Sequence, residues 1–600
     1  MGGMKAKFGH GRPFPVTVNP KRLAIERVAS GYRPWDGHHT PTPEHLMESR
    51  FPEHNKYDLW WKDAVIYCLD VETYLDSNGD GIGDFKGLTR SVDYLADLGV
   101  TCIWLMPFYP SPNRDDGYDV ADYYGVQSRL GDLGDFNQFM MACRERGIRV
   151  IADLVVNHTS DQHSWFQKAR TGPESEYHNY YVWEDERPDD WETSLVFPGE
   201  QIENWTYDRK AGRYFLHHFY RHQPDLNPGE PRVREEMKQI LSFWSQLGLS
   251  GFRVDAVPFL IELKQTDAQL EMTPHGFLED LSEYLRRRTG NSILLGEVNL
   301  PPQDAAEFFG DGDELQMLFA FNINQYLHLA LARKSAEPLR KALRSLPPIP
   351  PTCQWAHFLT NHDELTLDQL TDAERQEVFE EFGPEEDMQL YGRGIRRRLP
   401  TMLDGNDSRL RLSYSILFSL PGTPVLFYGE EIGMGENLNI PGRLSVRTPM
   451  QWTEGHNAGF SSSQESDLLR PITEGDFSPA SVNVASQLGK PDSMLSFMQL
   501  LIRRRRLTPE LGMGGYSVVG VEDPAVLAHR CDWDGEGVIA LHNLSDGDAK
   551  VDISDEVDDR NLVEIWRDRD YGDVTVGNVE LGPWGYRWIR LVDGAGADLV

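Results

Sequence analysis

The stretch IRVIADLVVNH (residues 148–158) runs through an apolar segment that contains Asp153 and ends in Asn157 and His158. A nearly continuous apolar run is typical of a strand that is buried on both faces of a parallel sheet. Seven further stretches share this pattern: AVIYCLDV (64–71), VTCIWLMPF (100–108), GFRVDAV (251–257), ILLGEVN (293–299), LQMLFAFNIN (315–324), WAHFLTNHDE (355–364) and TPVLFYGEE (423–431). Amphipathic helical segments lie between them, so the sequence predicts an α/β fold, a closed (β/α)₈ or TIM barrel.

Two connections are too long for ordinary barrel loops. We expect residues 159–225 to form a domain inserted after the third strand and residues 365–405 to form a lid-like insertion, which leaves 58–158 and 226–507 for the barrel. Short alternating strands separated by Gly and Asp predict an antiparallel β-sandwich domain over 508–600. Residues 1–57, rich in Pro, Arg, His and Gly, are expected to be an N-terminal extension, either a packed arm or partly disordered.

The composition narrows the class of function. The 600 residues include 94 acidic and 59 basic side chains, and the net charge of −35 argues against nucleic acid and membrane surfaces as partners. Neither a transmembrane run nor the apolar core of a secretory signal is present. The five cysteines form no CxxC pair and no zinc spacing, so we expect buried free thiols in a cytoplasmic protein. A homo-oligomer is neither favoured nor excluded.

Charged and polar side chains recur where the predicted strands end, which in a barrel is the face that carries the active site. They are Asp153, Asn157, His158, Arg253, Asp255, Glu297, His362, Asp363, Glu364, Glu430 and Glu431. One such carboxylate can simply cap a helix. Several at one barrel mouth, with His and Arg among them, indicate acid–base and nucleophilic chemistry at an acetal carbon. Arg253, two residues before Asp255, is placed to keep that carboxylate ionised.

The stretch DSNGDGIGDF (76–85) has the donor spacing of a calcium loop. Its ligand-type residues are Asp76, Asn78, Asp80 and Asp84, with Ile82 at the position that offers a backbone carbonyl. Gly87 stands where an EF-hand needs Glu, and the preceding segment is strand-like, so the loop is not an EF-hand. A solvated turn is the alternative, since Asp, Asn and Gly favour turns. Hard oxygen donors on a Gly-rich loop favour a structural Ca²⁺ site.

Four strand-end stretches resemble the signature regions of the α-amylase superfamily of glycoside hydrolases: DLVVNH (153–158), GFRVDAV (251–257), GEVN (296–299) and TNHDE (360–364). QPDLN (223–227) is similar to the fifth region of that superfamily. The similarity extends over residues 58–465 and is strongest to the subgroup that interconverts maltose and trehalose by intramolecular α-glucosyl transfer. The resemblance implies a small disaccharide substrate, one or two structural Ca²⁺ ions and no organic cofactor.

The resemblance also assigns roles. Asp255 matches the nucleophile, Glu297 the general acid/base and Asp363 a third carboxylate that binds sugar hydroxyls. The residues that match the sugar site are Asp115, Tyr118, His158, Arg253, His362, Arg443 and Arg447. The loop at 76–84 matches a calcium site after the first strand. A second calcium site is implied by Asn157, Asp225, the Phe259 and Leu260 carbonyls, and Glu262.

Two departures from the superfamily pattern leave the acceptor open. Cys68 and Glu72 stand in a stretch where relatives tend to have Glu-x-x-Val-Arg, and Leu444 replaces a polar residue near the acceptor sugar. An α-glucosidase, or a glucosyltransferase with another acceptor, would use the same catalytic groups. A non-catalytic sugar-binding protein should have lost one of the three carboxylates. A hydrolase that uses Ca²⁺ in its chemistry is disfavoured, because the calcium-loop ligands lie far in sequence from the strand ends.

The expected mechanism is a retaining double displacement with about 5–5.5 Å between the two reacting carboxyl groups. We expect the two insertions to retain the released glucose and to exclude water, with some hydrolysis to glucose as a side reaction.

Overall fold

Contacts divide the chain into a first unit, residues 1–56, and a second unit, Tyr57–Val600. A computed structural model describes residues 58–189, 195–261, 275–557 and 560–592, all of which belong to the second unit. The expected N-terminal extension lies outside these residues.

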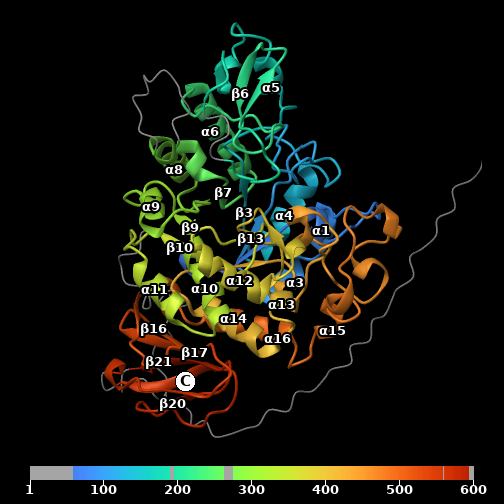
Figure 1. The fold of residues 1–600 in the computed structure, drawn as a ribbon. Helices are drawn as coiled ribbons and strands as arrows, with labels where there is room; N and C mark the ends of the chain where they lie inside the picture. The colour runs from blue at the N-terminus through green and yellow to red at the C-terminus, as the bar shows by residue number, and fades with distance from the viewer. Residues whose placement is uncertain (1–57, 190–194, 262–274, 558–559, 593–600) are drawn as a thin grey trace, which may run out of the picture. The chain divides into compact units, whose positions relative to one another are not determined.

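Eight parallel strands close into a barrel in the order β1-β14-β10-β9-β8-β7-β3-β2 (Figure 1). Their bounds are β1 (Ile66–Leu69), β2 (Cys102–Leu105), β3 (Arg149–Leu154), β7 (Gly251–Val254), β8 (Ile293–Gly296), β9 (Met317–Phe319), β10 (Gln354–His357) and β14 (Thr423–Phe427). Each strand overlaps one of the eight predicted stretches, so the predicted TIM barrel is confirmed.

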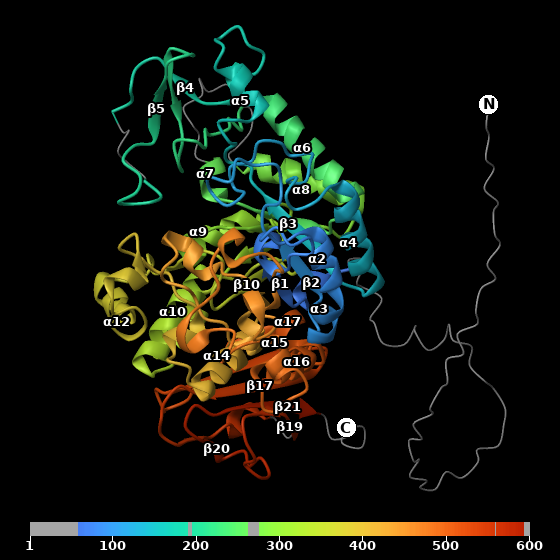
Figure 2. The ribbon, with the colours of Figure 1, turned by 90° about the vertical axis from the view of Figure 1, so that its right-hand side faces the viewer.

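Helices cover the outside of the barrel (Figure 2). Four of them pack directly on strands β3, β8, β10 and β14: α4 (Leu133–Glu145), α8 (Gly276–Thr289), α10 (Phe321–Arg333) and α14 (Asp407–Ser419). The sequence of α4 shows why it forms there. Asp132 caps its first turn in a reciprocal capping box with Asp135, and Phe136, Phe139 and Cys143 repeat at the spacing of one buried face. All five cysteines are free and buried, as predicted.

Both predicted insertions contain small antiparallel sheets. The first has β4 (Trp183–Glu184), β5 (Trp205–Asp208) and β6 (Arg213–Leu216) beside α5 (Ser164–Ala169). The second has β11 (Leu365–Thr366), β12 (Gln389–Leu390) and β13 (Gly394–Ile395) with α12 (Asp372–Phe382). The two insertions touch, because Arg393 Nη2 donates to the Val196 carbonyl at 2.7 Å and the rings of Phe197 and Tyr391 lie 5.3 Å apart. The boundaries given for the insertions stay a prediction.

The C-terminal part is an antiparallel β domain, as predicted. Its larger sheet contains β15 (Gly515–Val518), β16 (Val526–Trp533), β17 (Glu536–Asn543), β21 (Tyr586–Val592) and β19 (Asn561–Arg567). The smaller sheet pairs β18 (Ala549–Val551) with β20 (Val579–Leu581), and apolar side chains of both sheets form one buried cluster. Across the described part of the chain, no helix has the length and apolar character needed to cross a bilayer.

Candidate active site

The ends of β3, β7 and β8 bring three carboxylates around one guanidinium. Arg253 Nη1 donates to Asp153 Oδ1 at 2.6 Å and to Asp255 Oδ1 at 2.5 Å. Its Nη2 lies 2.7 Å from Glu297 Oε2. The register of the parallel strands produces this arrangement, because Asp153 is paired with Arg253 and Arg253 with Leu295, two residues before Glu297. These four residues, Asp153, Arg253, Asp255 and Glu297, are called the Arg253 cluster below.

The backbone directly after Asp255 is turned sharply. Ala256 has a φ of 52°, which is uncommon for a residue with a side chain. The turn aims the Ala256 N–H at Glu297 Oε2, at 3.1 Å. The strand end therefore orients two of the predicted catalytic carboxylates at once, Asp255 through its position and Glu297 through a backbone donor.

Burial and the neighbouring charges set the pKa values of these carboxylates. Burial raises the pKa of Asp255 to about 6, against the opposing effect of the Arg253 guanidinium. Burial also raises the pKa of Glu297, and the charges of Asp255 and Asp363 add to that effect while Arg253 lowers it. At a pKa of about 6, Asp255 is mostly ionised at neutral pH. Cleavage of a glycosidic bond requires one carboxylate and one carboxylic acid, and Asp255 and Glu297 contact the same guanidinium.

Asp363, after β10, is held as a permanent anion. Its Oδ1 accepts hydrogen bonds from Arg443 Nη1 and Arg447 Nη2, both at 2.8 Å, and its Oδ2 lies 3.1 Å from His362 Nε2. Burial alone would raise its pKa, but His362 and the two arginines outweigh burial, so the pKa of Asp363 lies well below the usual range. An anion fixed in this way can accept hydrogen bonds from sugar hydroxyls without competing for the catalytic proton.

The remaining predicted sugar-site residues form a wall beside Asp363. Tyr118 Oη lies 2.8 Å from His362 Nε2, and the two rings are nearly parallel. Asp115 accepts from Arg443 Nη2 at 3.0 Å and from Gln223 Nε2 at 2.8 Å, so Arg443 bridges Asp115 and Asp363. Burial raises the pKa of Asp115 to about 6, with Arg443 opposing it.

His158 is also buried. Its ring packs on Phe219, with 5.0 Å between the ring centroids, and Asn157 Nδ2 lies 3.4 Å from its Nδ1.

Sequence reasoning missed the second set of contacts of Arg447. Arg447 Nη1 donates to Asp116 Oδ2 at 2.5 Å, and Asp116 also contacts Arg470, which lies 3.1 Å from Asp70 Oδ2. Glu72, marked in the sequence only as unusual, pairs with Arg129. The doubled Asp in RDDGYD is the one local signal that Asp116 has a partner of its own. Asp70, Glu72, Asp116, Arg129 and Arg470 are called the Arg470 cluster below.

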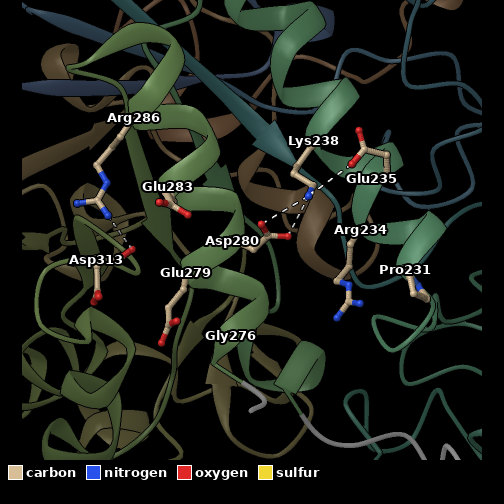
Figure 3. Close-up of a pocket in the computed structure, with 10 residues that line it drawn as sticks. All are labelled: Pro231, Arg234, Glu235, Lys238, Gly276, Glu279, Asp280, Glu283, Arg286 and Asp313. Atoms are coloured by element: carbon tan, nitrogen blue, oxygen red, sulfur yellow. Dashed lines mark hydrogen bonds and ion pairs between the residues drawn. The ribbon is translucent and has the colours of Figure 1, made fainter. Parts of the chain in front are cut away.

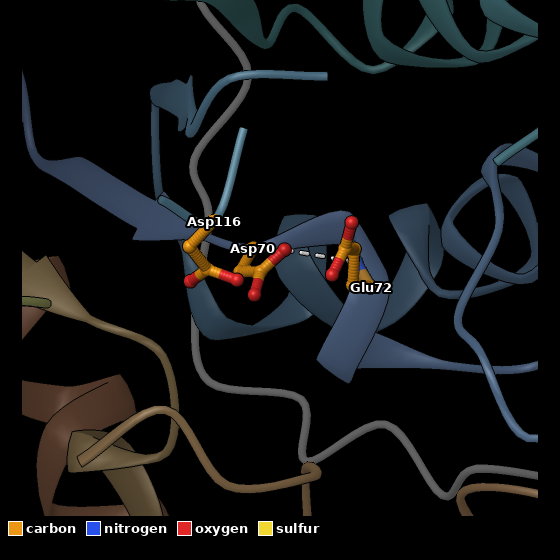
Figure 4. Close-up of side chains that lie close together, drawn as sticks. All are labelled: Asp70, Glu72 and Asp116. Carbon is orange, nitrogen blue, oxygen red and sulfur yellow. Dashed lines mark hydrogen bonds between the residues drawn. The ribbon is translucent and has the colours of Figure 1, made fainter. Parts of the chain in front are cut away.

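The three carboxylates of the Arg470 cluster lie close together, as Figure 4 shows, with ligand atoms all within 4.8 Å of one another. Spacing alone would allow a cation between them. However, Arg470 contacts Asp70 and Asp116, Arg447 contacts Asp116, and Arg129 contacts Glu72. A divalent ion would lie beside these guanidinium groups, and like charges in a buried site repel strongly. The cluster therefore fits a salt-bridge network better than a metal site.

In the loop at 76–84, the side-chain oxygens that could bind a cation also accept hydrogen bonds from nearby N–H and O–H groups. Asp76 Oδ1 accepts from the backbone of Asn78 and Gly79, and its Oδ2 accepts from Gly81 N and from Ser461 Oγ. Gly81 has a φ of 90°, and a Cβ there would lie 2.1 Å from the Asp467 carbonyl oxygen, so only glycine fits. The loop is thus anchored on the segment around Ser461 and Asp467, unlike a freely solvated turn.

The other ligand-type side chains of this loop also accept hydrogen bonds from backbone N–H groups of nearby residues. Asn78 Oδ1 accepts from Asp80 N, Asp80 Oδ1 accepts from Ile82 N, and Asp84 caps α2 (Phe85–Arg90). The donor set, carboxylate and amide oxygens with a backbone carbonyl, fits Ca²⁺.

Part of the second predicted calcium site comes together. Asn157 Nδ2 lies 3.3 Å from Asp225 Oδ1, and Asp225 contacts His218, whose ring lies 5.1 Å from that of Phe259. Leu260 follows Phe259 and is buried. Glu262 lies outside the described residues.

Figure 3 shows a cavity of about 660 Å³ elsewhere, between α6 (Pro231–Gln246) and α8. Its walls carry charges of both signs, and Lys238 already contacts Glu235 and Asp280. None of the predicted catalytic residues lines it. The strand ends remain the candidate active site.

Comparisons with known proteins agree with this geometry. The model of the family described as "Alpha amylase, catalytic domain" matches residues 70–382 and 396–514, and that of a "Sucrose hydrolase-like, C-terminal domain" matches 535–590. The trehalose synthase/amylase TreS of Mycolicibacterium smegmatis is 41% identical over 500 residues, covering 81% of this chain and 84% of that protein. The trehalose synthase of Pimelobacter sp. is 38% identical over 556 residues, covering 89% and 96%.

Solved structures share the fold. The trehalulose synthase MutB of Pseudomonas mesoacidophila superposes with a TM-score of 0.70 at 27% identity, over 89% of this chain and 99% of that one.

Proposed function

The chain belongs to the α-amylase family, and we propose that it interconverts maltose and trehalose by intramolecular transfer of an α-glucosyl group. Relatives named trehalose synthase are about 40% identical over most of the chain. The observation that carries the proposal at the level of chemistry is the Arg253 cluster, in which one guanidinium contacts both Asp255 and Glu297.

In the proposed reaction, Asp255 attacks C1 of the non-reducing glucose of maltose. Glu297 gives its proton to the departing glycosidic oxygen, so that the C1–O bond breaks while the C1–Asp255 bond forms. Glu297, now ionised, takes the proton of the anomeric hydroxyl of the released glucose, and that oxygen attacks C1. The Asp255 ester is displaced and trehalose results. Two displacements at C1 preserve the α configuration.

The other site residues hold the transferred glucose. Asp363 and Asp115 accept hydrogen bonds from its hydroxyls, and Arg443 fixes the distance between these two carboxylates. Tyr118, stacked on His362, presents an aromatic face to the ring, and His158 adds a further wall. Arg447 completes the support of Asp363.

Isomerisation requires that the released glucose stays while water is excluded. The contact between the two insertions supports this requirement. Phe197 packs on Tyr391 from the second insertion, and the Arg443 guanidinium lies 4.9 Å from the centre of the Phe197 ring. The two insertions therefore meet beside the residue that clamps Asp115 and Asp363. We assign them the role of a lid over the retained glucose.

Calcium has a structural role in this proposal. The loop at 76–84 would hold one ion through Asp76, Asn78, Asp80, Asp84 and the Ile82 carbonyl. Asn157, Asp225, the Phe259 and Leu260 carbonyls and Glu262 would hold a second. Bound Ca²⁺ would tie the loop after β1 to the barrel, and no catalytic step depends on it.

Incubation of the pure protein with maltose, with trehalose and glucose quantified by anion-exchange chromatography, tests the function. We expect trehalose as the main product, a smaller amount of glucose, and the reverse reaction from trehalose. Glucose as the sole product would refute the proposed transfer reaction and identify an α-glucosidase. Leu444 would then be the first residue to test as the cause. Absence of turnover with maltose, together with turnover of sucrose or isomaltose, would identify another glucosyl donor.

A variant of the lid separates transfer from hydrolysis. Phe197→Ala removes the ring between Tyr391 and Arg443, so we expect a several-fold higher ratio of glucose to trehalose with little change in maltose consumption. Phe308→Ala, at a buried ring outside the site, is the matched control for loss of an aromatic side chain. An unchanged product ratio in Phe197→Ala would refute the lid role.

A further inference from the structure

Arginines gather around a cavity on the first insertion, away from the catalytic carboxylates. The cavity has a volume of about 560 Å³ and lies between α5, the β5–β6 hairpin and the loops that follow β2 and β6. Its lining includes Arg114, Arg170, Arg209, Arg221, His222 and Tyr207. The whole chain has 94 acidic and 59 basic residues, yet here four arginines face only two aspartates, Asp161 and Asp208. The sign of the charge is locally reversed.

Two of these arginines are already neutralised. Arg114 contacts both carboxylate oxygens of Asp161, and Arg170 Nη2 lies 2.6 Å from Asp208 Oδ2. Arg209 and Arg221 are exposed, and neither forms a salt bridge with any residue in the described part of the chain. The lining therefore keeps an excess of positive charge, which Asp119 behind Arg114 offsets in part.

His222 adds a ring nitrogen that has no partner among the described residues. Its Nε2 is buried and makes no hydrogen bond within the described residues, and its ring stacks on Tyr220 with the centroids 5.4 Å apart. A buried polar nitrogen without a partner is costly, so such a group points to a ligand or water that would satisfy it.

We propose that this cavity binds a phosphorylated sugar, with the phosphate held by Arg209 and Arg221. A guanidinium matches phosphate oxygens with two parallel N–H donors, which makes exposed and unpaired arginines the preferred phosphate ligands of proteins. Tyr207, also on the cavity wall, is 47% exposed and offers a flat aromatic face to the sugar ring.

Two residues that line the cavity are next in sequence to residues of the proposed sugar site. Arg114 precedes Asp115, and His222 precedes Gln223, which donates to Asp115 at 2.8 Å. A ligand that contacts Arg114 or His222 thus touches the chain neighbours of Asp115 itself and of Gln223, one of the two residues that donate to Asp115. Because coupling between two sites is reciprocal, the bound phosphate ester and maltose should each change the affinity for the other. This kinetic consequence rests on the proposed function, whereas the binding itself does not.

Isothermal titration calorimetry on the full chain tests the site directly. The probes are glucose 6-phosphate, inorganic phosphate and glucose, and the proteins are the wild type, an Arg209→Gln/Arg221→Gln double variant and an Arg503→Gln/Arg506→Gln control. The control removes the same charge from two exposed arginines at the end of α16 (Met494–Arg506).

We expect glucose 6-phosphate to bind the wild type at least about tenfold more tightly than either other probe. The cavity variant should lose about tenfold in affinity, while the control stays within about twofold of the wild type. Equal loss in the control would overturn the site in favour of general charge attraction. Absence of binding below about 10 mM would overturn the proposal as well. Equal affinity for inorganic phosphate would refute the sugar contact.

The closing measurement is the KM for maltose with and without glucose 6-phosphate. A shift in the wild type that is absent from the cavity variant supports the coupling, and an unchanged KM despite measured binding refutes it. A protein that binds glucose 6-phosphate but does not convert maltose would refute only the proposed function.

Discussion

The Arg253 cluster and the Arg470 cluster contain the same kinds of side chain, arginine and carboxylate, but differ in how far a carboxylate is exposed. In both, guanidinium groups contact several carboxylates that are buried or partly buried. In the Arg253 cluster the side chain of Glu297 keeps 27% of its surface exposed, whereas that of Glu72 in the Arg470 cluster keeps 6%. Glu297 is therefore open to a ligand, whereas Glu72 is enclosed by its partners, although both are glutamates that contact an arginine.

Arg447 connects Asp363 of the candidate sugar site to the Arg470 cluster. Its Nη2 contacts Asp363 in the sugar site and its Nη1 contacts Asp116 in the Arg470 cluster. We therefore regard the Arg470 cluster as the support of the sugar site, and the following variants test that division from the largest expected effect to the smallest.

The largest effect is expected from Asp255→Asn. The amide can still accept from Arg253 but cannot form the glycosyl ester, so kcat/KM should fall by about 10⁴-fold, or about 5.5 kcal/mol. Steady-state kinetics with maltose measures this loss, and circular dichroism shows whether the fold is kept. Full activity in the variant would refute the assignment of the nucleophile.

Arg470→Gln should act on stability more than on chemistry. It leaves Asp70 and Asp116 buried without their main counter-charge, and loss of one partner from a buried pair costs about 3–5 kcal/mol. Urea unfolding measures the change in the free energy of unfolding. Arg287→Gln, which breaks an exposed pair with Glu283, is the control and should cost less than about 1 kcal/mol. An activity loss as large as that of Asp255→Asn, without a loss of stability, would contradict the division between the clusters.

Removal of calcium should lower stability by about 2.7 kcal/mol if the ion is present at 100 times its Kd. EDTA should therefore reduce the melting temperature and leave the turnover of still-folded protein unchanged. In Asp80→Ala, which lacks an exposed ligand of the loop, the EDTA effect should be smaller than in the wild type. Immediate loss of turnover in folded protein would indicate a catalytic ion, and an unchanged melting temperature would favour an ordinary turn.

The pH profile should show an acid limb near pH 6. Burial raises the pKa of Asp255 to about 6, and protonation removes the nucleophile, so kcat/KM should fall about tenfold per pH unit below that value. The contribution of Asp255 to stability should depend on pH in the opposite direction from kcat/KM. Because the folded state holds this proton more tightly than the unfolded chain, the contribution of Asp255 to stability is greatest below its ordinary pKa and is lost as the pH rises through 6. An acid limb near pH 4 would show that Asp255 is not shifted.

Glu72→Gln should have the smallest effect. Burial and the charges of Asp70 and Asp116 raise the pKa of Glu72 to about 8, so glutamine resembles the form that prevails at neutral pH. We expect kcat to stay within about twofold and the free energy of unfolding to change by less than about 1 kcal/mol. Kinetics and urea unfolding on one preparation measure both quantities. A tenfold loss of kcat would show that the charge of Glu72 reaches the sugar site.

The barrel could be predicted from the sequence, and so could the strand ends that carry the proposed catalytic carboxylates. Both follow from local properties, since a strand buried in a parallel sheet must be apolar along its length and the carboxyl ends of all eight strands meet on one face. For that reason Asp255, Glu297 and Asp363 could be placed together before any contact was known.

Which charged groups pair could not be predicted from the sequence. Asp70 and Arg470 are 400 residues apart, and neither carries a local sign of the other. Gln223 of the first insertion meets Asp115 of a barrel loop, and Phe197 meets Tyr391 of the second insertion, and the closed barrel positions all of these segments. Buried charges and rings pair when the fold brings them close together and excludes water from around them. The periodicity of the sequence reports neither the distance between two remote residues nor their exposure to water.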